Sequence, residues 1–172
     1  MNGDVSAMNP IDWLCDKVPR FSDLSCAERL EIMHFVLLWS LFEAKALDTR
    51  ASAERILALS HKWAQTGRLT IDSFAQSLNY FRDRYFKEGV ETDHFSRLNF
   101  RRNDNQALVR AVLKGEITNI ADSVAALLIV VFRLRNNLFH GLKWADGIRG
   151  QLSNFANANV ALIAALEMHN QF

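Results

Sequence analysis

The sequence predicts an all-α fold, an antiparallel helical bundle with short connections. Apolar residues recur at helical spacing along most of the chain, and no stretch shows a sustained alternation of period two. At 172 residues the chain is also long enough to form one domain with a substantial core. We therefore expect a single all-helical domain over residues 1–172, with residues 1–9 frayed.

Seven segments combine helical periodicity with helix start or stop signals. They span residues 11–18, 26–46, 50–65, 71–87, 104–114, 120–140 and 148–169. Pro10 suits the first turn of the first segment, and Ser25 with Glu28 has the spacing of a capping box at the start of the second. Thr49 and Thr70 are candidate caps for the third and fourth segments.

The predicted buried faces follow from apolar residues three and four positions apart. They comprise Leu30, Met33, Leu37 and Leu41 in the second segment, Phe74, Leu78, Phe81 and Tyr85 in the fourth, and Leu152, Phe155, Val160, Ile163 and Leu166 in the last. Because the aromatic stripes match an inward helix face, we interpret them as core rather than as surfaces on which bases stack. Cys15 and Cys26 are isolated and are expected to pack as small apolar groups.

Residues 90–103 interleave aromatic and basic side chains and predict a short helix followed by a loop. Such a segment can hold RNA through phosphate contacts and stacking. It is also what an amphipathic surface segment looks like when long arginines lie along apolar neighbours. Asn103 or Asp104 is then expected to cap the next helix, and Gly115 to end it.

The most informative stretch lies at the end of the longest apolar helix. Residues 123–132 read SVAALLIVVF, which predicts a helix in the middle of the core. Residues 133–143 then read RLRNNLFHGLK, so that two arginines, two asparagines and a histidine follow in close succession. Gly141 can adopt the left-handed conformation that ends helices. A buried helix thus carries a cationic, hydrogen-bonding cluster at its C-terminal end.

The sequence from Arg135 and Asn136 through three residues to His140 and Gly141 resembles the signature of the HEPN superfamily, in its Apea-like branch. This resemblance implies a HEPN-like helical bundle and a metal-independent endoribonuclease. It also implies a homodimer whose composite site brings both motifs to one cleft. The biological settings that it implies are defence, stress response and toxin–antitoxin systems.

The residue types in the motif suit RNA cleavage through the 2′-hydroxyl. His140 is the candidate general acid/base, because histidine exchanges protons near neutral pH. Arg135 is the candidate phosphate stabiliser and Asn136 the residue that orients either partner. Lys143, Arg133 and Asn137 belong to the same cluster and are candidate substrate-binding residues.

Five positions along a regular helix correspond to a rotation of about 140°, so Arg135 and His140 would not share one face. Either the helix loosens before Gly141, or the site is built from two subunits. One position departs from toxins whose partner antitoxin is a small nucleotidyltransferase: they commonly carry a tyrosine two positions after the histidine, where this chain has Leu142. A different antitoxin or regulatory protein therefore remains an open partner.

Composition and charge limit the alternatives. The net charge is +1, but residues 1–44 have a balance of −4 and residues 45–150 one of +6, so the basic excess accompanies the motif and suits a polyanion such as RNA. The histidines lack paired ligand spacing, and we expect no metal and no cofactor. The first residues lack the pattern of a secretory signal, and no apolar run approaches the ~20 residues of a membrane span, so we expect a cytoplasmic protein without a membrane partner.

Three other interpretations of the motif stay open. Arginine and histidine near a helix C-terminus also stabilise the last carbonyl groups, so the cluster can be a structural cap. The chain can be a non-catalytic HEPN-like domain that binds RNA, a nucleotide or a protein partner. It can also be a helical interaction module without ligand chemistry.

Overall fold

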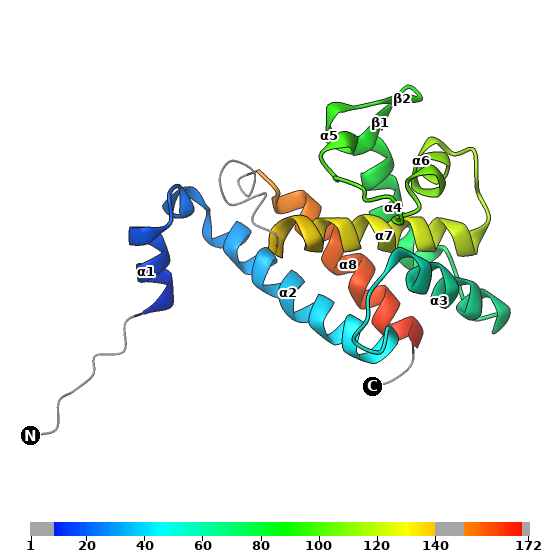
Figure 1. Cartoon of the computed structure of the whole chain (residues 1–172), viewed down its shortest axis with the longest axis horizontal. Helices are drawn as coiled ribbons and strands as arrows, with labels where there is room; N and C mark the ends of the chain where they lie inside the picture. The colour runs from blue at the N-terminus through cyan, green and yellow to red at the C-terminus, as the bar shows by residue number, and fades with distance from the viewer. Residues whose placement is uncertain (1–8, 140–149, 170–172) are drawn as a thin grey trace, which may run out of the picture.

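The protein is predominantly helical, as expected (Figure 1). The computed structural model describes residues 9–139 and 150–169. The helices are α1 (Pro10–Lys17), α2 (Cys26–Ala46), α3 (Ala53–Gln65), α4 (Asp72–Tyr85), α5 (Asp93–Ser96), α6 (Gln106–Lys114), α7 (Ile120–Phe139) and α8 (Leu152–His169). A 3-10 turn, η1 (Phe21–Asp23), follows α1, and two strands, β1 (Phe86–Lys87) and β2 (Val90–Glu91), follow α4.

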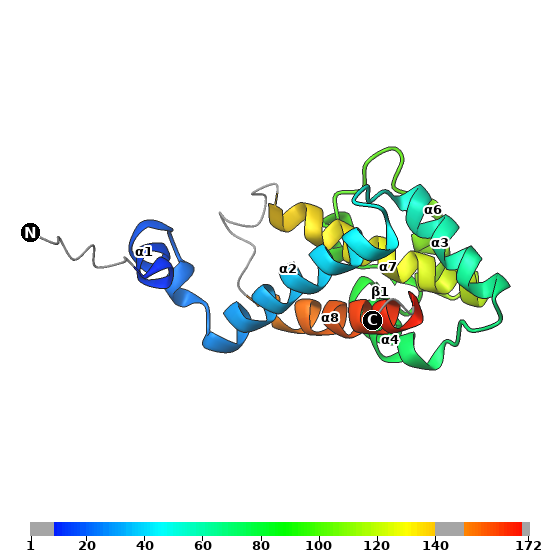
Figure 2. The same ribbon diagram turned by 90° about the horizontal axis from the view of Figure 1, so that it is seen from below.

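Helix α7 lies at the centre of the bundle (Figures 1 and 2). It packs against α3, α4, α6 and α8, while α2 packs along α8. Of its 20 residues, 16 are buried, which agrees with the apolar run from Ser123 to Phe132. The sequence therefore identified the core helix correctly. Polar residues near the C-terminal end of this helix, including Arg133, Asn136 and Asn137, are buried as well.

Helix α2 begins as predicted but buries a different face. The side chain of Ser25 accepts a hydrogen bond from the amide of Glu28, and the Glu28 carboxylate accepts one from the amide of Ser25, which confirms the capping box. However, the predicted face was wrong, because Leu30, Met33 and Leu37 are 47–62% exposed. The buried residues of α2 are instead Phe35, Trp39 and Phe42. Since α2 has apolar residues on all sides, periodicity could not select a face, and the large aromatic side chains occupy the core.

Two predicted helix caps were also wrong. Ser52, rather than Thr49, accepts the hydrogen bond from the amide of Arg55 that caps α3. Thr49 has a positive φ of 59° in the turn before α3. The α4 helix begins after Ile71 without a side-chain cap.

The segment after α4 contains a hairpin that the sequence did not predict. Phe86 pairs with Glu91 and Lys87 with Val90 in an antiparallel register. The two residues between the strands, Glu88 and Gly89, have φ values of 52° and 77°, as a tight hairpin turn of type I′ requires. The short helix α5 follows, as expected, and α6 starts after Asn105 rather than after Asn103 or Asp104.

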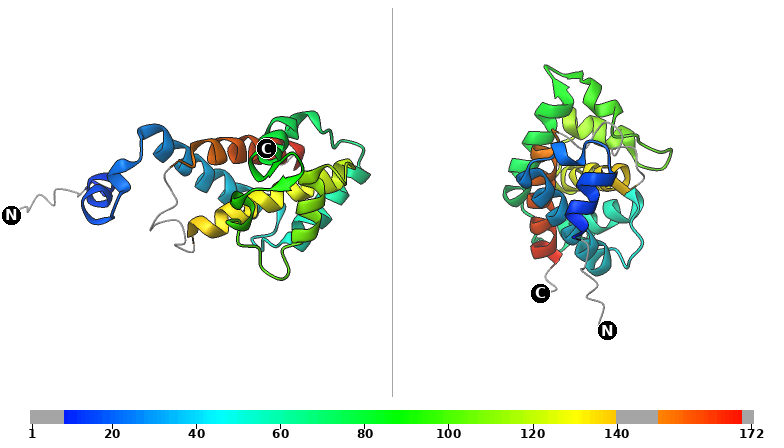
Figure 3. Two further views of the ribbon diagram at one scale, coloured as in Figure 1. Left: turned by 90° about the horizontal axis from the view of Figure 1, so that it is seen from above. Right: turned by 90° about the vertical axis from the view of Figure 1, so that its left-hand side faces the viewer.

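Helix α1 stands away from the bundle at the end where α2 begins (Figures 1 and 3). None of its residues is buried, and its main neighbour is η1. Cys26 is exposed, contrary to the prediction that it packs inside. In the last helix, Phe155 and Leu166 are buried as predicted, whereas Leu152 and Ile163 are exposed. Within the described ranges, no helix is both long and apolar enough to cross a membrane.

Candidate functional site

Arg135 lies on the side of α7 that faces α2. Its Nη2 is 3.4 Å from Oε2 of Glu43, and its Nη1 donates a hydrogen bond of 3.1 Å to Oδ1 of Asn136. Asn136 itself is 5% exposed and is therefore held by the surrounding core. A neighbour with a fixed position thus orients the guanidinium, which is the geometry that an orienting role for Asn136 requires.

Two aromatic rings complete the surroundings of Arg135. Its guanidinium carbon is 5.8 Å from the ring centre of Trp39 and 5.2 Å from that of Phe139, within the range of cation–π attraction. Phe139 lies one turn further along the same face of α7 and is 55% exposed. The aromatic contacts add to the Glu43 pair and restrict the rotamers that Arg135 can adopt.

Glu43 connects three parts of the chain at this point. Its Oε2 accepts a hydrogen bond of 2.8 Å from Nε1 of Trp39 in addition to the ion pair with Arg135. Its Oε1 accepts one of 3.2 Å from the amide of Ala51, in the segment between α2 and α3. The carboxylate is therefore oriented by groups other than Arg135, so that the position of the arginine is defined by a preformed acceptor.

The Arg135 side chain is nevertheless 29% exposed. A guanidinium has more N–H donors than the two contacts to Asn136 and Glu43 engage. An anion that approaches this end of α7 can accept hydrogen bonds from an arginine whose position is already fixed, which is the arrangement expected of a phosphate-stabilising residue.

Arg133 lies on the opposite side of α7 and has a structural role. It is 2% exposed, and its Nη1 is 2.9 Å from Oδ2 of Asp104. Its Nε donates a hydrogen bond of 3.0 Å to the carbonyl of Leu98, and its Nη2 donates to that of Asn99. Burial lowers the pKa of Arg133, and the Asp104 carboxylate opposes this effect. Arg133 is therefore engaged by the protein itself, and this geometry lends no support to its predicted role in substrate binding.

Asn137 shares the side of α7 on which Arg133 lies. It is 1% exposed, and its Nδ2 donates hydrogen bonds to the carbonyls of Arg97 and Leu98, at 3.0 and 3.2 Å. The Asn137 side chain therefore fixes the loop after α5, and this geometry lends no support to its predicted substrate contact either. His140 and Lys143, the candidate acid/base and the candidate phosphate contact, lie outside the described residues.

Sequence reasoning missed Glu43 and Trp39. The available signal was local: a tryptophan and a glutamate four positions apart on a helix, with the glutamate following a run from Val36 to Phe42 that is apolar except for Ser40. Glu43 and its partner Arg135 are 92 positions apart, so the sequence could not show that they meet in the fold. In the part of the chain that the structure describes, no three His, Cys, Asp or Glu side chains gather into a group that could hold a metal ion.

Comparisons with family models, with curated proteins and with solved structures found no match to this chain.

Proposed function

We propose that the protein is a cytoplasmic, metal-independent endoribonuclease of the HEPN type, active as a homodimer with a composite site. The observation that carries the proposal is the state of Arg135. Glu43, Asn136 and two aromatic rings define its position, yet 29% of its side chain remains exposed. An arginine that only capped the helix would not require a preformed carboxylate on a neighbouring helix.

The proposed reaction uses the 2′-hydroxyl of RNA as the nucleophile. His140 removes the proton from this hydroxyl, and its oxygen attacks the adjacent phosphorus to form a 2′,3′-cyclic phosphate. The protonated His140 then gives the proton to the 5′-oxygen of the next nucleotide, which leaves as a hydroxyl group. Arg135 stabilises the negative charge that develops on the phosphoryl oxygens. Asn136 holds the Arg135 guanidinium through the hydrogen bond at 3.1 Å. Defence, stress response and toxin–antitoxin regulation are the settings in which we expect such an activity.

The proposed dimer has a candidate surface at the end of the molecule where α7 terminates, on the left in Figure 1. Helix α1, the first half of α2 and the C-terminal turn of α7 all lie at this end (Figures 1 and 2). Five large apolar side chains of α1 and α2 are 42–62% exposed: Ile11, Trp13, Leu30, Met33 and Leu37. Exposed apolar side chains on consecutive helices are typical of a surface that a partner covers. A two-fold interface over this surface would place the two α7 ends near one another.

The first experiment is cleavage of a mixed single-stranded RNA by the purified protein in the presence of a chelator. Arg135→Ala and His140→Ala are compared with wild type, and Arg68→Ala serves as the matched control because Arg68 is exposed and distant in sequence from the motif. We expect cleavage by wild type and Arg68→Ala, and a loss of about 100-fold or more in the two motif variants. Circular dichroism and light scattering establish that each variant keeps its fold and its oligomeric state.

The composite nature of the site has its own test. Arg135→Ala and His140→Ala proteins are mixed and allowed to exchange subunits. If His140 of one subunit acts with Arg135 of the other, each heterodimer contains one intact site and cleavage returns. If both residues act within one subunit, the mixture stays inactive. Met33→Glu, which places a charge on the exposed face of α2, is expected to give an inactive monomer.

The outcomes also separate the alternatives. RNA binding without cleavage by wild type and His140→Ala alike would indicate the non-catalytic binding domain. Neither binding nor cleavage of any RNA would indicate the helical interaction module. Cleavage that Arg135→Ala leaves unchanged would contradict the proposal directly.

A further inference from the structure

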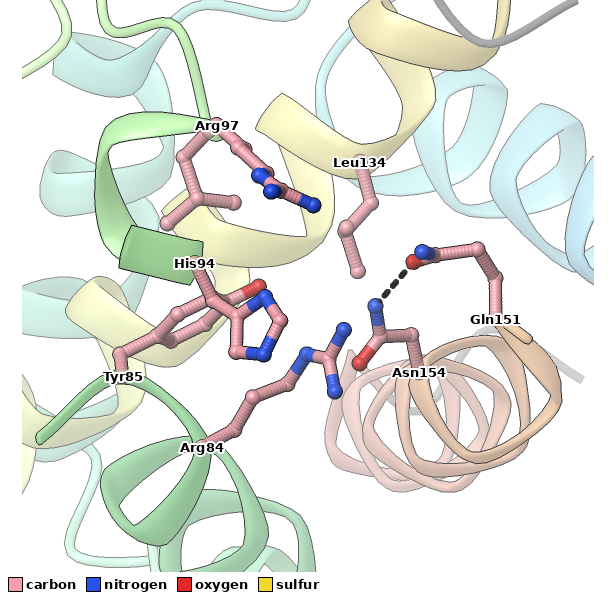
Figure 4. Close-up of a pocket in the computed structure, with 8 residues that line it drawn as sticks. Arg84, Tyr85, His94, Arg97, Leu134, Gln151 and Asn154 are labelled. Atoms are coloured by element: carbon pink, nitrogen blue, oxygen red, sulfur yellow. Dashed lines mark hydrogen bonds between the residues drawn. The ribbon is translucent and has the colours of Figure 1, made fainter. Parts of the chain in front are cut away.

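Two arginines and a histidine surround a pocket beside Leu134 of α7 (Figure 4). The pocket encloses about 270 Å³ of empty space, including its mouth. Its polar lining consists of Arg84 at the end of α4, His94 in α5, Arg97 directly after α5, and Gln151 and Asn154 at the start of α8. Tyr85, Leu98 and Leu134 complete the wall. Segments far apart in the sequence therefore bring two arginines and a histidine to one hollow.

Among the residues that the structure describes, no carboxylate lines this pocket. Within residues 9–139 and 150–169, neither Arg84 nor Arg97 forms an ion pair, whereas nearby segments have their charges matched: Glu91 pairs with Arg110, and Asp104 pairs with Arg133. Figure 4 shows the guanidinium groups of Arg84 and Arg97 and the ring of His94 directed toward the same space. Among the described residues, the two guanidinium groups of Arg84 and Arg97 therefore have no counter-charge.

Within the described part of the chain, the surroundings of Arg84 supply no negative charge. Its neighbours are the phenol groups of Tyr80 and Tyr85, and burial raises the pKa of both. The phenols therefore stay neutral and serve as hydrogen-bonding partners rather than as counter-ions. Nε of Arg84 is buried and has no hydrogen-bond partner in the described part of the chain. A buried donor without an acceptor is a costly feature that a bound ligand can relieve.

We propose that this pocket is a binding site for a phosphate group, carried by a nucleotide or by an RNA strand. The planar donor groups of Arg84 and Arg97 match the oxygens of a phosphate. The first turn of α8 borders the pocket, and the partial positive charge at a helix start favours an anion there. The two guanidinium groups would hold the phosphate itself, and the rest of the ligand would lie outside the pocket. The site does not depend on cleavage by Arg135 and His140.

The experiment uses the full chain and three probes: inorganic phosphate, a short RNA with a 5′-phosphate, and the same RNA with a 5′-hydroxyl. Thermal unfolding with increasing phosphate, at constant ionic strength in chloride, reports the first probe. Fluorescence anisotropy reports the two RNAs. Arg97→Gln is the main variant, because Arg97 is exposed and its loss should leave the fold intact. Arg84→Gln is the second variant, and Arg68→Gln is the control.

We expect inorganic phosphate to raise the unfolding temperature of wild type and Arg68→Gln but not of Arg97→Gln. We expect Arg97→Gln and Arg84→Gln to weaken RNA binding by about tenfold or more, as the loss of one charged hydrogen bond does. A preference for the 5′-phosphate RNA would identify a terminal phosphate as the ligand, and equal binding of both RNAs would identify the backbone. Equal responses of wild type and Arg97→Gln to all three probes would overturn the proposal, even if Arg135 and His140 cleave RNA.

Discussion

Arg133 and Arg135 are two residues apart on α7 but have opposite environments. Arg133 is 2% exposed and bound by a carboxylate and two carbonyl groups. The Arg135 side chain is 29% exposed and is held by one carboxylate, one amide and two aromatic rings. Two positions on a helix correspond to a rotation of about 200°, so each arginine faces different elements. The comparison teaches that arginines in one motif can differ completely in what they do.

The two arginines also differ in whether a ligand can reach their N–H donors. The contacts of Arg133 close the loop between α5 and α6 against α7, and a ligand could reach them only if the protein opened. The contacts of Arg135 leave donors available at the surface. The first arginine is therefore expected to control stability, and the second to control the interaction with an anion.

The largest effect is expected from Arg133→Met. Removal of one partner leaves the Asp104 carboxylate buried without its counter-charge, which costs about 3–5 kcal/mol. Urea unfolding followed by circular dichroism measures this loss. Arg133→Met combined with Asp104→Asn should recover part of the stability, because the unpaired charge is then absent. A loss below about 1 kcal/mol in the single variant would contradict the structural role of Arg133.

The second effect sharpens the comparison, since Arg135→Met should separate stability from activity. The pair with Glu43 is partly exposed, and the aromatic contacts are modest, so we expect a loss of about 1–2 kcal/mol. RNA cleavage, by contrast, should fall by about 100-fold or more if the proposed function holds. The same unfolding curves and the cleavage assay provide both values. If Arg135→Met were as unstable as Arg133→Met, the two arginines would both be structural and the cap interpretation would gain support.

The sequence predicted the features of this molecule that depend on near neighbours. The Ser25–Glu28 capping box, the buried aromatic stripe of α4 and the apolar core of α7 all follow from residues a few positions apart. The buried face of α2 could not be predicted in this way, because apolar residues occur all around that helix and its packing against other helices decides which of them are buried. The different roles of Arg133 and Arg135 could not be predicted either, because their partners Asp104 and Glu43 are distant in the sequence. The phosphate pocket escaped prediction for the same reason: its cationic groups meet amides from the start of α8 only in the folded chain.

A smaller effect is expected from Glu43→Gln, which tests how Arg135 is held. The amide oxygen of glutamine can still accept one hydrogen bond, from the indole of Trp39 or from the amide of Ala51, but the charge opposite Arg135 is lost. We expect a stability loss of about 0.5–1 kcal/mol. Cleavage should fall less than in Arg135→Met, because Asn136 still accepts from Nη1 of Arg135. A Glu43→Gln protein as inactive as Arg135→Met would show that the carboxylate itself takes part in the reaction.

The smallest effect is expected at the N-terminal end of α7, where Asp122 contacts two polar side chains near the surface. Asn119 donates a hydrogen bond of 2.6 Å to Asp122, and Nε2 of His61 lies 2.9 Å from the same carboxylate. These contacts lower the pKa of Asp122, the Asn119 bond being the main cause, while burial opposes them. Because the folded protein holds the proton more weakly than the unfolded chain, the contribution to stability is complete above the unfolded pKa of about 3.9. It is lost as the pH falls through the lower, folded pKa.

Asp122→Asn should therefore reduce the free energy of unfolding at pH 7 by no more than about 1 kcal/mol. The difference from wild type should shrink below about pH 4, because the wild-type carboxyl group then becomes neutral as well. Urea unfolding at several pH values between 7 and 3 measures this dependence. Asp72→Asn is the matched control, since Asp72 also lies in the first turn of a helix but is exposed. A constant difference between Asp122→Asn and wild type at every pH would mean that the side-chain shape, rather than its charge, stabilises the start of α7.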